Sequence, residues 1–63
     1  MTHKQESWLR QYLAVMGYKE NTKSSTIYDE IMAGQIPIIS YMYGIDRDML
    51  GKYLKGYLNI NEL

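Results

Sequence analysis

The sequence lacks cysteine altogether and contains only one histidine, His3. Without cysteine the protein has neither a disulfide nor a thiolate metal site, and a single histidine cannot build a zinc site by itself. We therefore expect no bound metal, no cofactor and a reducing environment.

Long hydrophobic runs and an excess of one charge are also missing. No apolar run approaches the roughly 18 to 20 residues that a membrane span needs, and the opening residues, MTHKQES, are too polar for a secretory signal. We expect a cytoplasmic protein without a membrane partner. Lysine and arginine number 7, as do aspartate and glutamate, and the balance holds in both halves of the chain. Neither half is therefore the basic module that is typical of nucleic-acid binding.

Groups that could support catalysis are absent too. Ser24, Ser25 and Ser40 have no second histidine, cysteine or lysine arrangement that would activate a nucleophile. The carboxylates Asp29 and Glu30 are adjacent in sequence and cannot face one another on a helix. The glycines are scattered, so no phosphate-binding loop is present. We expect no enzymatic activity and no small-molecule substrate.

What the chain does contain is helical periodicity over most of its length. At 63 residues it is expected to form one domain, residues 1–63, with a thin core, because such a chain buries only about 60% of its unfolded surface. The pattern predicts an all-α, four-helix domain with helices over about 7–16, 26–33, 37–43 and 47–58. Residues 1–5 are expected to be disordered and residues 59–63 to form an irregular tail.

Polar residues and glycines mark the expected helix ends. Gly17 and Gly34 are placed to end the first two helices as C-caps. Ser24 or Ser25 is placed to begin the second helix, and Asn59 can adopt the left-handed conformation at the end of the fourth. The apolar residues of the third helix repeat at helical spacing: Ile36, Ile38, Ile39, Met42 and Tyr43.

The last two predicted helices meet at a glycine. Five positions carry the pattern of a tight turn between packed helices: Ser40, Gly44, Ile45, Asp46 and Leu50. With them, residues 39–56 resemble the helix-turn-helix of lambda-repressor-like and Cro-like phage regulators. In this resemblance Ser40 stands where the helices approach closest, Asp46 caps the second helix, and Leu50 locks it onto the first. The other interpretation is an ordinary helical bundle in which Gly44 is only a C-cap.

The outward side of the fourth helix is the candidate binding surface. Its candidate contact residues are Arg47, Asp48, Met49, Gly51, Lys52 and Lys55. In a DNA major groove, Arg47 can pair with guanine and Met49 can touch a thymine methyl, while Lys19 and Lys23 are possible phosphate contacts. Seven basic residues spread over the whole chain nevertheless predict weak DNA binding by a single copy.

A protein partner suits the sequence better than DNA. Tyrosine (7) and methionine (5) are abundant, and both supply large, adaptable contact surfaces. Gly51 and Gly56 are expected to let another backbone approach closely. In size and style the chain is also similar to small temperate-phage antirepressors, or modulators of repression, which bind the DNA-reading domain of a repressor.

That second resemblance implies a transcription regulator in the cytoplasm of a bacterial host cell. It would bind a repressor and control a lysis-lysogeny switch, with Asp46 and Asp48 meeting basic residues that the repressor otherwise offers to phosphate. The alternative is a Cro-like repressor that reads an operator major groove with residues 46–58.

Overall fold

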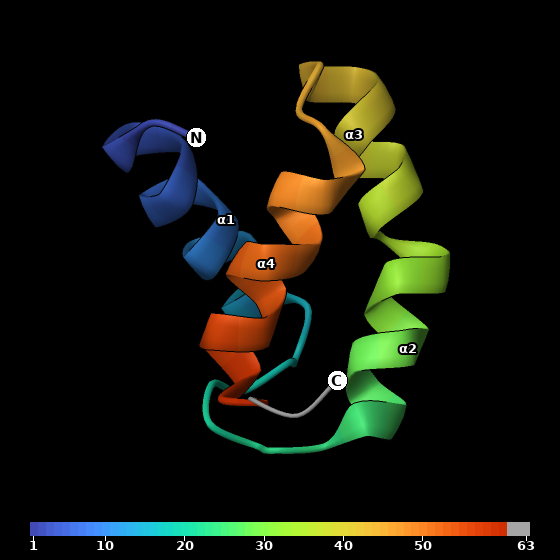
Figure 1. Ribbon diagram of the computed structural model, residues 1–63. Coiled ribbons are helices and arrows are strands. Elements are labelled where there is room, and N and C mark those ends of the chain that lie inside the picture. The colour runs from blue at the N-terminus through green and yellow to red at the C-terminus, as the bar shows by residue number, and fades with distance from the viewer. Residues whose placement is uncertain (61–63) are drawn as a thin grey trace.

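Four helices make up the computed structural model, which describes residues 1–60. They are α1 (His3–Val15), α2 (Ser25–Gly34), α3 (Ile36–Tyr43) and α4 (Arg47–Leu58), and the described residues contain no strand (Figure 1). In the view of Figure 1, α2 and α3 follow one another along one side and α4 lies between α2 and α1. The predicted all-α, four-helix domain is confirmed.

The first helix begins earlier than the sequence analysis predicted. Thr2 and Gln5 form a capping box, in which the Gln5 backbone N–H donates to Thr2 Oγ1 (3.1 Å) and the Thr2 N–H donates to Gln5 Oε1 (2.9 Å). Each bond satisfies a backbone donor that a helix start otherwise leaves open. The prediction of disorder over residues 1–5 was therefore wrong for residues 3–5, which lie in α1.

The end of α1 follows the prediction at Gly17. This residue has a φ of 93°, and the Tyr18 N–H donates to the Leu13 carbonyl at 2.9 Å, which is the long hydrogen bond of a Schellman motif. Asn59, with a φ of 58°, ends α4 in the same way. Residues 61–63 of the predicted irregular tail lie outside the described residues.

Helix α2 ends at Gly34, as predicted, but Gly34 is not the left-handed C-cap that the sequence analysis expected. The φ of Gly34 is not left-handed. The next residue, Gln35, has a right-handed helical conformation and leads directly into α3. The two helices are separated because Pro37 lies in the first turn of α3. Its ring nitrogen carries no hydrogen, so it cannot donate to the carbonyl four residues earlier in α2. Proline, and not glycine, therefore sets this boundary.

Leucine and isoleucine supply almost the whole core. The buried residues are Leu9, Leu13, Ile31, Ile36, Ile39, Ile45, Leu50, Leu54, Tyr57 and Leu58. Other tyrosines lie around this core, and their hydroxyls tie α1 to the other helices. Tyr12 donates to Gln35 Oε1 at 2.6 Å, and Tyr53 donates to the Glu6 carbonyl at 3.2 Å. The tyrosines thus act as a polar-tipped shell around an aliphatic core.

The loop between α1 and α2 closes the carboxyl end of α4. The backbone N–H groups of Asn21 and Lys23 donate to the carbonyls of Tyr57 (2.9 Å) and Leu58 (2.8 Å). Both donors have a positive φ, near 60°, which turns their N–H groups toward the helix end. Two carbonyls that a helix terminus usually leaves unpaired are therefore satisfied by this loop. Within residues 1–60, no helix is both long and apolar enough to cross a membrane.

Replacement of Gly44 and of Gly56 by alanine is expected to have opposite effects on stability. Gly44 has a φ of 65°, which a side chain disfavours, whereas Gly56 is helical and has open space where a Cβ would lie. We expect Gly44→Ala to lower the free energy of unfolding by about 1 kcal/mol and Gly56→Ala to raise it by up to about 1 kcal/mol. Urea unfolding followed by circular dichroism measures both. Equal effects of the two variants would contradict the prediction.

Candidate functional site

The turn between α3 and α4 is held by short, specific hydrogen bonds. Gly44 ends α3 in the left-handed conformation, and its N–H donates to the Ser40 carbonyl at 3.0 Å. The Ser40 hydroxyl reaches across the turn and donates to the Ile45 carbonyl at 2.7 Å. Asp46 then caps α4, its Oδ1 accepting from the Asp48 N–H at 3.1 Å. The three residues between the helices, Gly44, Ile45 and Asp46, therefore redirect the chain from α3 into α4.

Apolar burial fixes the same turn from the inside. Ile45 is 8% exposed and Leu50, one turn into α4, is fully buried. Ser40 also has a role beyond small size, because its hydroxyl bonds the turn directly. The start of α4 is thus a rigid platform for the side chains that point outward from it.

The sequence analysis placed Gly51 on the outward surface of α4, but in the structure Gly51 does not lie there. It is buried, and a Cβ built on it would lie 3.4 Å from both the Met32 Cε and the Tyr28 hydroxyl. The long side chains of α2 extend over this position, which a helical wheel of α4 alone does not reveal. Gly51 therefore serves the packing of α2 on α4 and cannot admit a partner's backbone.

The remaining candidate contact residues divide between two hollows beside α4. Arg47, Asp48, Lys52 and Lys55 line a shallow hollow of about 220 Å³ on the α2 side, together with the side chains that cover Gly51. Met49 lies on the other side, in a hollow of about 390 Å³ between α4 and the start of α1. Lys52 lines both. The exposed side of α4 is therefore a ridge of mixed charge, with Asp46 and Asp48 near its start.

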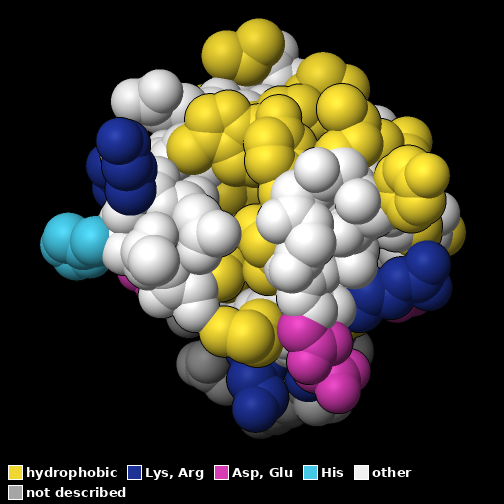
Figure 2. Space-filling view, turned by 90° about the horizontal axis from the view of Figure 1, so that it is seen from above, with side chains coloured by type: hydrophobic (Ala, Val, Ile, Leu, Met, Phe, Trp, Pro, Cys, Tyr) yellow, Lys and Arg dark blue, Asp and Glu magenta, His cyan; other side chains and the backbone are white. Residues whose placement is uncertain are grey.

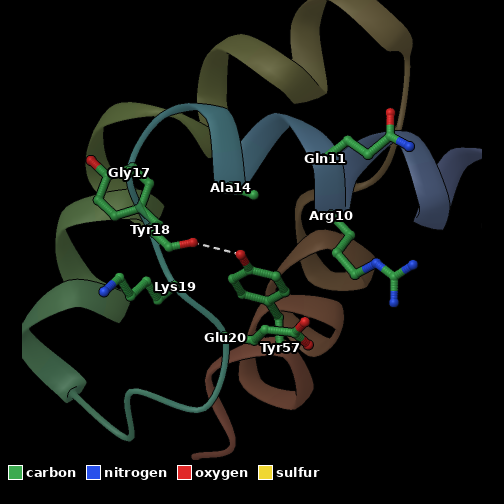
Figure 3. A pocket seen from close by; sticks show the side chains of 8 residues that line it. All are labelled: Arg10, Gln11, Ala14, Gly17, Tyr18, Lys19, Glu20 and Tyr57. Carbon is green, nitrogen blue, oxygen red and sulfur yellow. Dashed lines mark hydrogen bonds between the residues drawn. The ribbon is translucent and has the colours of Figure 1, made fainter.

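Lys19 and Lys23, the predicted phosphate contacts, lie at the opposite end of α4. The Lys23 backbone caps Leu58, which at about 1.5 Å per residue lies about 16 Å along the helix from Arg47. Lys19 lines a hollow of about 460 Å³ with Arg10 and Tyr57 (Figure 3). In the view of Figure 3, Lys19 and Arg10 lie on either side of the Tyr57 ring. The fold therefore does not gather these cations beside the start of α4.

Among the described residues, the largest exposed apolar surface is on α3, the helix whose apolar residues recur at helical spacing. Ile36 and Ile39 are buried, but four other side chains of this helix are exposed: Ile38 (52%), Tyr41 (90%), Met42 (66%) and Tyr43 (51%). We call these four residues the α3 patch. Figure 2 views the molecule from the α3 end. Hydrophobic side chains gather on this face, and charged side chains lie at its edge.

The signal for the α3 patch was present in the sequence. Residues 36–43 are mostly apolar on every side of the helix and include no charged residue, whereas a surface helix normally has one polar face. Beside the patch, Trp8 of α1 packs on Tyr43 with ring centroids 4.5 Å apart. Trp8, Tyr43 and Ile45 also line a largely apolar hollow of about 310 Å³. Patch and hollow therefore adjoin at Tyr43, which belongs to both.

Two tyrosines of α4 have perturbed acidity. Burial raises the pKa of the Tyr53 hydroxyl and, with the nearby Glu20 carboxylate adding to the effect, the pKa of the Tyr57 hydroxyl. Both hydroxyls are hydrogen-bond donors, Tyr53 to the Glu6 carbonyl and Tyr57 to the Tyr18 carbonyl at 2.5 Å. Deprotonation removes these bonds. Both groups hold the fold together, since each joins α4 to another segment.

This arrangement predicts a loss of stability at high pH. Because the pKa of both tyrosines is raised above the unfolded value of 10.0, the stabilisation is complete below about pH 10 and is lost as pH rises through the folded pKa values. Urea unfolding at about pH 8 and pH 11 measures the difference. The double variant Tyr53→Phe, Tyr57→Phe should lose less stability than the natural protein over this range. An equal loss in both proteins would show that other groups are responsible.

Comparison of the chain with protein-family models, curated proteins and solved structures gives no match. Among residues 1–60, no three histidine, aspartate or glutamate side chains are grouped so that they could hold a metal ion. The features of the described residues that could bind a partner are the α3–α4 turn, the mixed-charge ridge of α4 and the α3 patch.

Proposed function

We propose that this protein is a small phage-type transcription regulator that acts as an antirepressor. In this proposal α3, the turn and α4 form a helix-turn-helix, and the outward side of α4 binds the DNA-binding domain of a partner repressor. The complex would control a lysis-lysogeny switch in the cytoplasm of a bacterial host. The short turn with left-handed Gly44, the buried Ile45 and the capped start of α4 support this motif.

The distribution of charge around the start of α4 is the observation that favours protein over DNA. A helix-turn-helix that reads DNA places its first helix across the phosphate backbone and the start of its second in the major groove. Here the first helix, α3, has no basic residue, and the first turn of α4 combines Arg47 with exposed Asp46 and Asp48. Phosphate neutralisation by lysine and arginine supplies most non-specific DNA affinity. The outer surface of α3 and of the start of α4 offers few cations that could neutralise phosphates.

The same carboxylates suit a basic protein surface. The DNA-binding face of a repressor is expected to be rich in arginine and lysine, so Asp46 and Asp48 would meet opposite charges there. Asp46 is held in place by its capping hydrogen bond, and Asp48 stands in the first helical turn. Arg47 and Lys52, also exposed, would select against partners with a basic patch in another register.

The test is a titration with the cognate repressor, identified beforehand by pull-down from the source cells. We expect the DNA-binding domain of that repressor to form a complex at micromolar concentration in isothermal titration calorimetry. A mobility-shift assay at low salt with the promoter DNA should show little binding by this protein alone. Absence of a complex at micromolar concentration would contradict the antirepressor proposal.

No complex with the repressor, together with clear binding to promoter DNA, would favour the Cro-like alternative. In that case the protein alone would shift the promoter DNA, and Arg47→Ala would abolish the shift or change the base preference. Arg47 is exposed in the first turn of α4, so its replacement is expected to leave the fold intact. Circular dichroism of the variant provides that control.

A further inference from the structure

The α3 patch is large for a protein of this size. At roughly 200 Å² for a whole large side chain, its four residues expose at most about 500 Å². The largest apolar patch on a monomeric protein is typically about 300 to 600 Å² and often has a function. Tyr41, at 90% exposure, has almost no contact with the rest of the chain. Tyr43 packs on Trp8, but packing within the molecule does not account for Ile38, Tyr41 and Met42.

The patch is compatible with its own copy. Two-fold symmetric pairing sets the same surface against itself, so a charge near the two-fold axis would face its own copy. Residues 36–43 contain none, and the whole chain has a formal net charge of zero. Tyrosine and methionine are enriched in the centres of protein interfaces, where lysine and glutamate are depleted. Neither the net charge of the chain nor a charge on α3 itself therefore opposes pairing through α3, and Lys4 is the one charged residue that lines the adjoining hollow.

Shape also favours self-association, because a protrusion and a hollow lie side by side. The protrusion is the exposed ridge of Ile38, Tyr41 and Met42, which recur at i, i+3 and i+4 on one side of α3. The hollow lies between α3 and α1. Trp8, Tyr43 and Ile45 form its apolar lining, and Thr2, Lys4 and Gln5 of the N-terminal segment complete it. In a symmetric pair, each copy can insert a ridge side chain near the hollow of the other.

We propose that the α3 patch is a homodimer interface, in which α3 packs against α3 of a second copy. Complete burial of the patch on both copies would remove at most about 1,000 Å² from water, which is near the lower limit for a specific interface. The expected dimer is therefore of modest, micromolar affinity. This inference does not depend on the proposed function, since Arg47, Asp48 and Lys52 lie outside the patch.

Sedimentation velocity over about 10 µM to 1 mM tests the dimer directly. The natural protein should pass from monomer to dimer over this range. Tyr41→Lys and Met42→Lys each introduce like charges into the interface and should raise the dissociation constant at least about 30-fold. Both positions are exposed, so circular dichroism should show an unchanged fold. Val15→Lys is the matched control, because Val15 is 86% exposed but lies at the end of α1.

Cross-linking provides a second measurement that does not depend on affinity. Because the chain has no cysteine, the single variants Ile38→Cys, Tyr41→Cys and Met42→Cys each carry one thiol. At least one should form a disulfide dimer rapidly on mild oxidation, since residues near the two-fold axis come within about 4.4 to 6.8 Å of their copies. Val15→Cys should not.

Three outcomes would overturn the proposal. One is a natural protein that stays monomeric throughout the concentration range. Another is a dimer that survives Tyr41→Lys and Met42→Lys unchanged, or that cross-links as readily through Val15→Cys. The third is a monomer whose α3 patch becomes covered only when the repressor is added, which would assign the patch to that partner.

Discussion

Replacing Leu50 with alanine is expected to unfold a large fraction of the molecules at room temperature. Leu50 is completely buried and joins the start of α4 to the core. Truncating a buried leucine to alanine typically costs about 3 to 5 kcal/mol, and a 63-residue domain has only about 3 to 9 kcal/mol of stability in total. Thermal unfolding and urea titration, both followed by circular dichroism, measure the loss.

The neighbouring residue provides a matched control for Leu50. Met49 belongs to the same helical turn but is 42% exposed, so Met49→Ala removes a similar number of atoms from a site that is open to water and leaves no enclosed cavity. We expect it to cost less than about 1 kcal/mol. If both variants were equally stable, the packing of Leu50 would not be what locks α4 in place. The contrast also separates the structural from the exposed positions of the candidate site.

Reversing the charge of Asp48 is expected to change the two candidate activities in opposite directions. In the antirepressor proposal, Asp48→Lys replaces an attractive carboxylate with a cation that repels a basic repressor surface, so affinity for the repressor should fall at least about 30-fold. The same substitution adds a cation at the start of α4, which should increase salt-dependent DNA binding. Calorimetry with the repressor and mobility shift with promoter DNA follow the two effects.

Two further variants make the Asp48 experiment specific. Asp48→Asn removes the charge without adding one and should show an intermediate loss of repressor affinity. Asp29→Lys makes the same charge reversal at an exposed position of α2 that lines neither hollow beside α4. If Asp29→Lys weakened the complex as much as Asp48→Lys, overall charge would be responsible and the assignment of this surface would be wrong.

The helices and most of their ends could be predicted because they depend on short stretches of sequence. Asp46 and Asn59 bound α4 at the positions the sequence indicated, since capping involves only the next few backbone groups. The start of α1 was missed although its signal, Thr2 followed three residues later by Gln5, is equally local. The end of α2 at Gly34 was predicted correctly but for the wrong reason, because Gly34 is not a left-handed cap and the decisive residue is Pro37, whose effect reaches back four residues.

The candidate site could be predicted only in part, because exposure depends on which helix covers which face. Arg47, Asp48 and Lys52 are exposed as the pattern of α4 indicates. Gly51 precedes the exposed Lys52 on the same helix, yet it is covered by side chains of α2, which lies about twenty residues earlier in the sequence. Periodicity within one helix cannot reveal such coverage.

By itself, then, the sequence determined the helical class, the turn at Gly44 and the near balance of charge around α4, because these follow from local conformation and composition. Tertiary structure alone decided that Gly51 is packed inside and that α3 presents Tyr41 and Met42 to solvent. An apolar helix can bury only the side that faces its neighbours, and in this small fold one whole side of α3 has none.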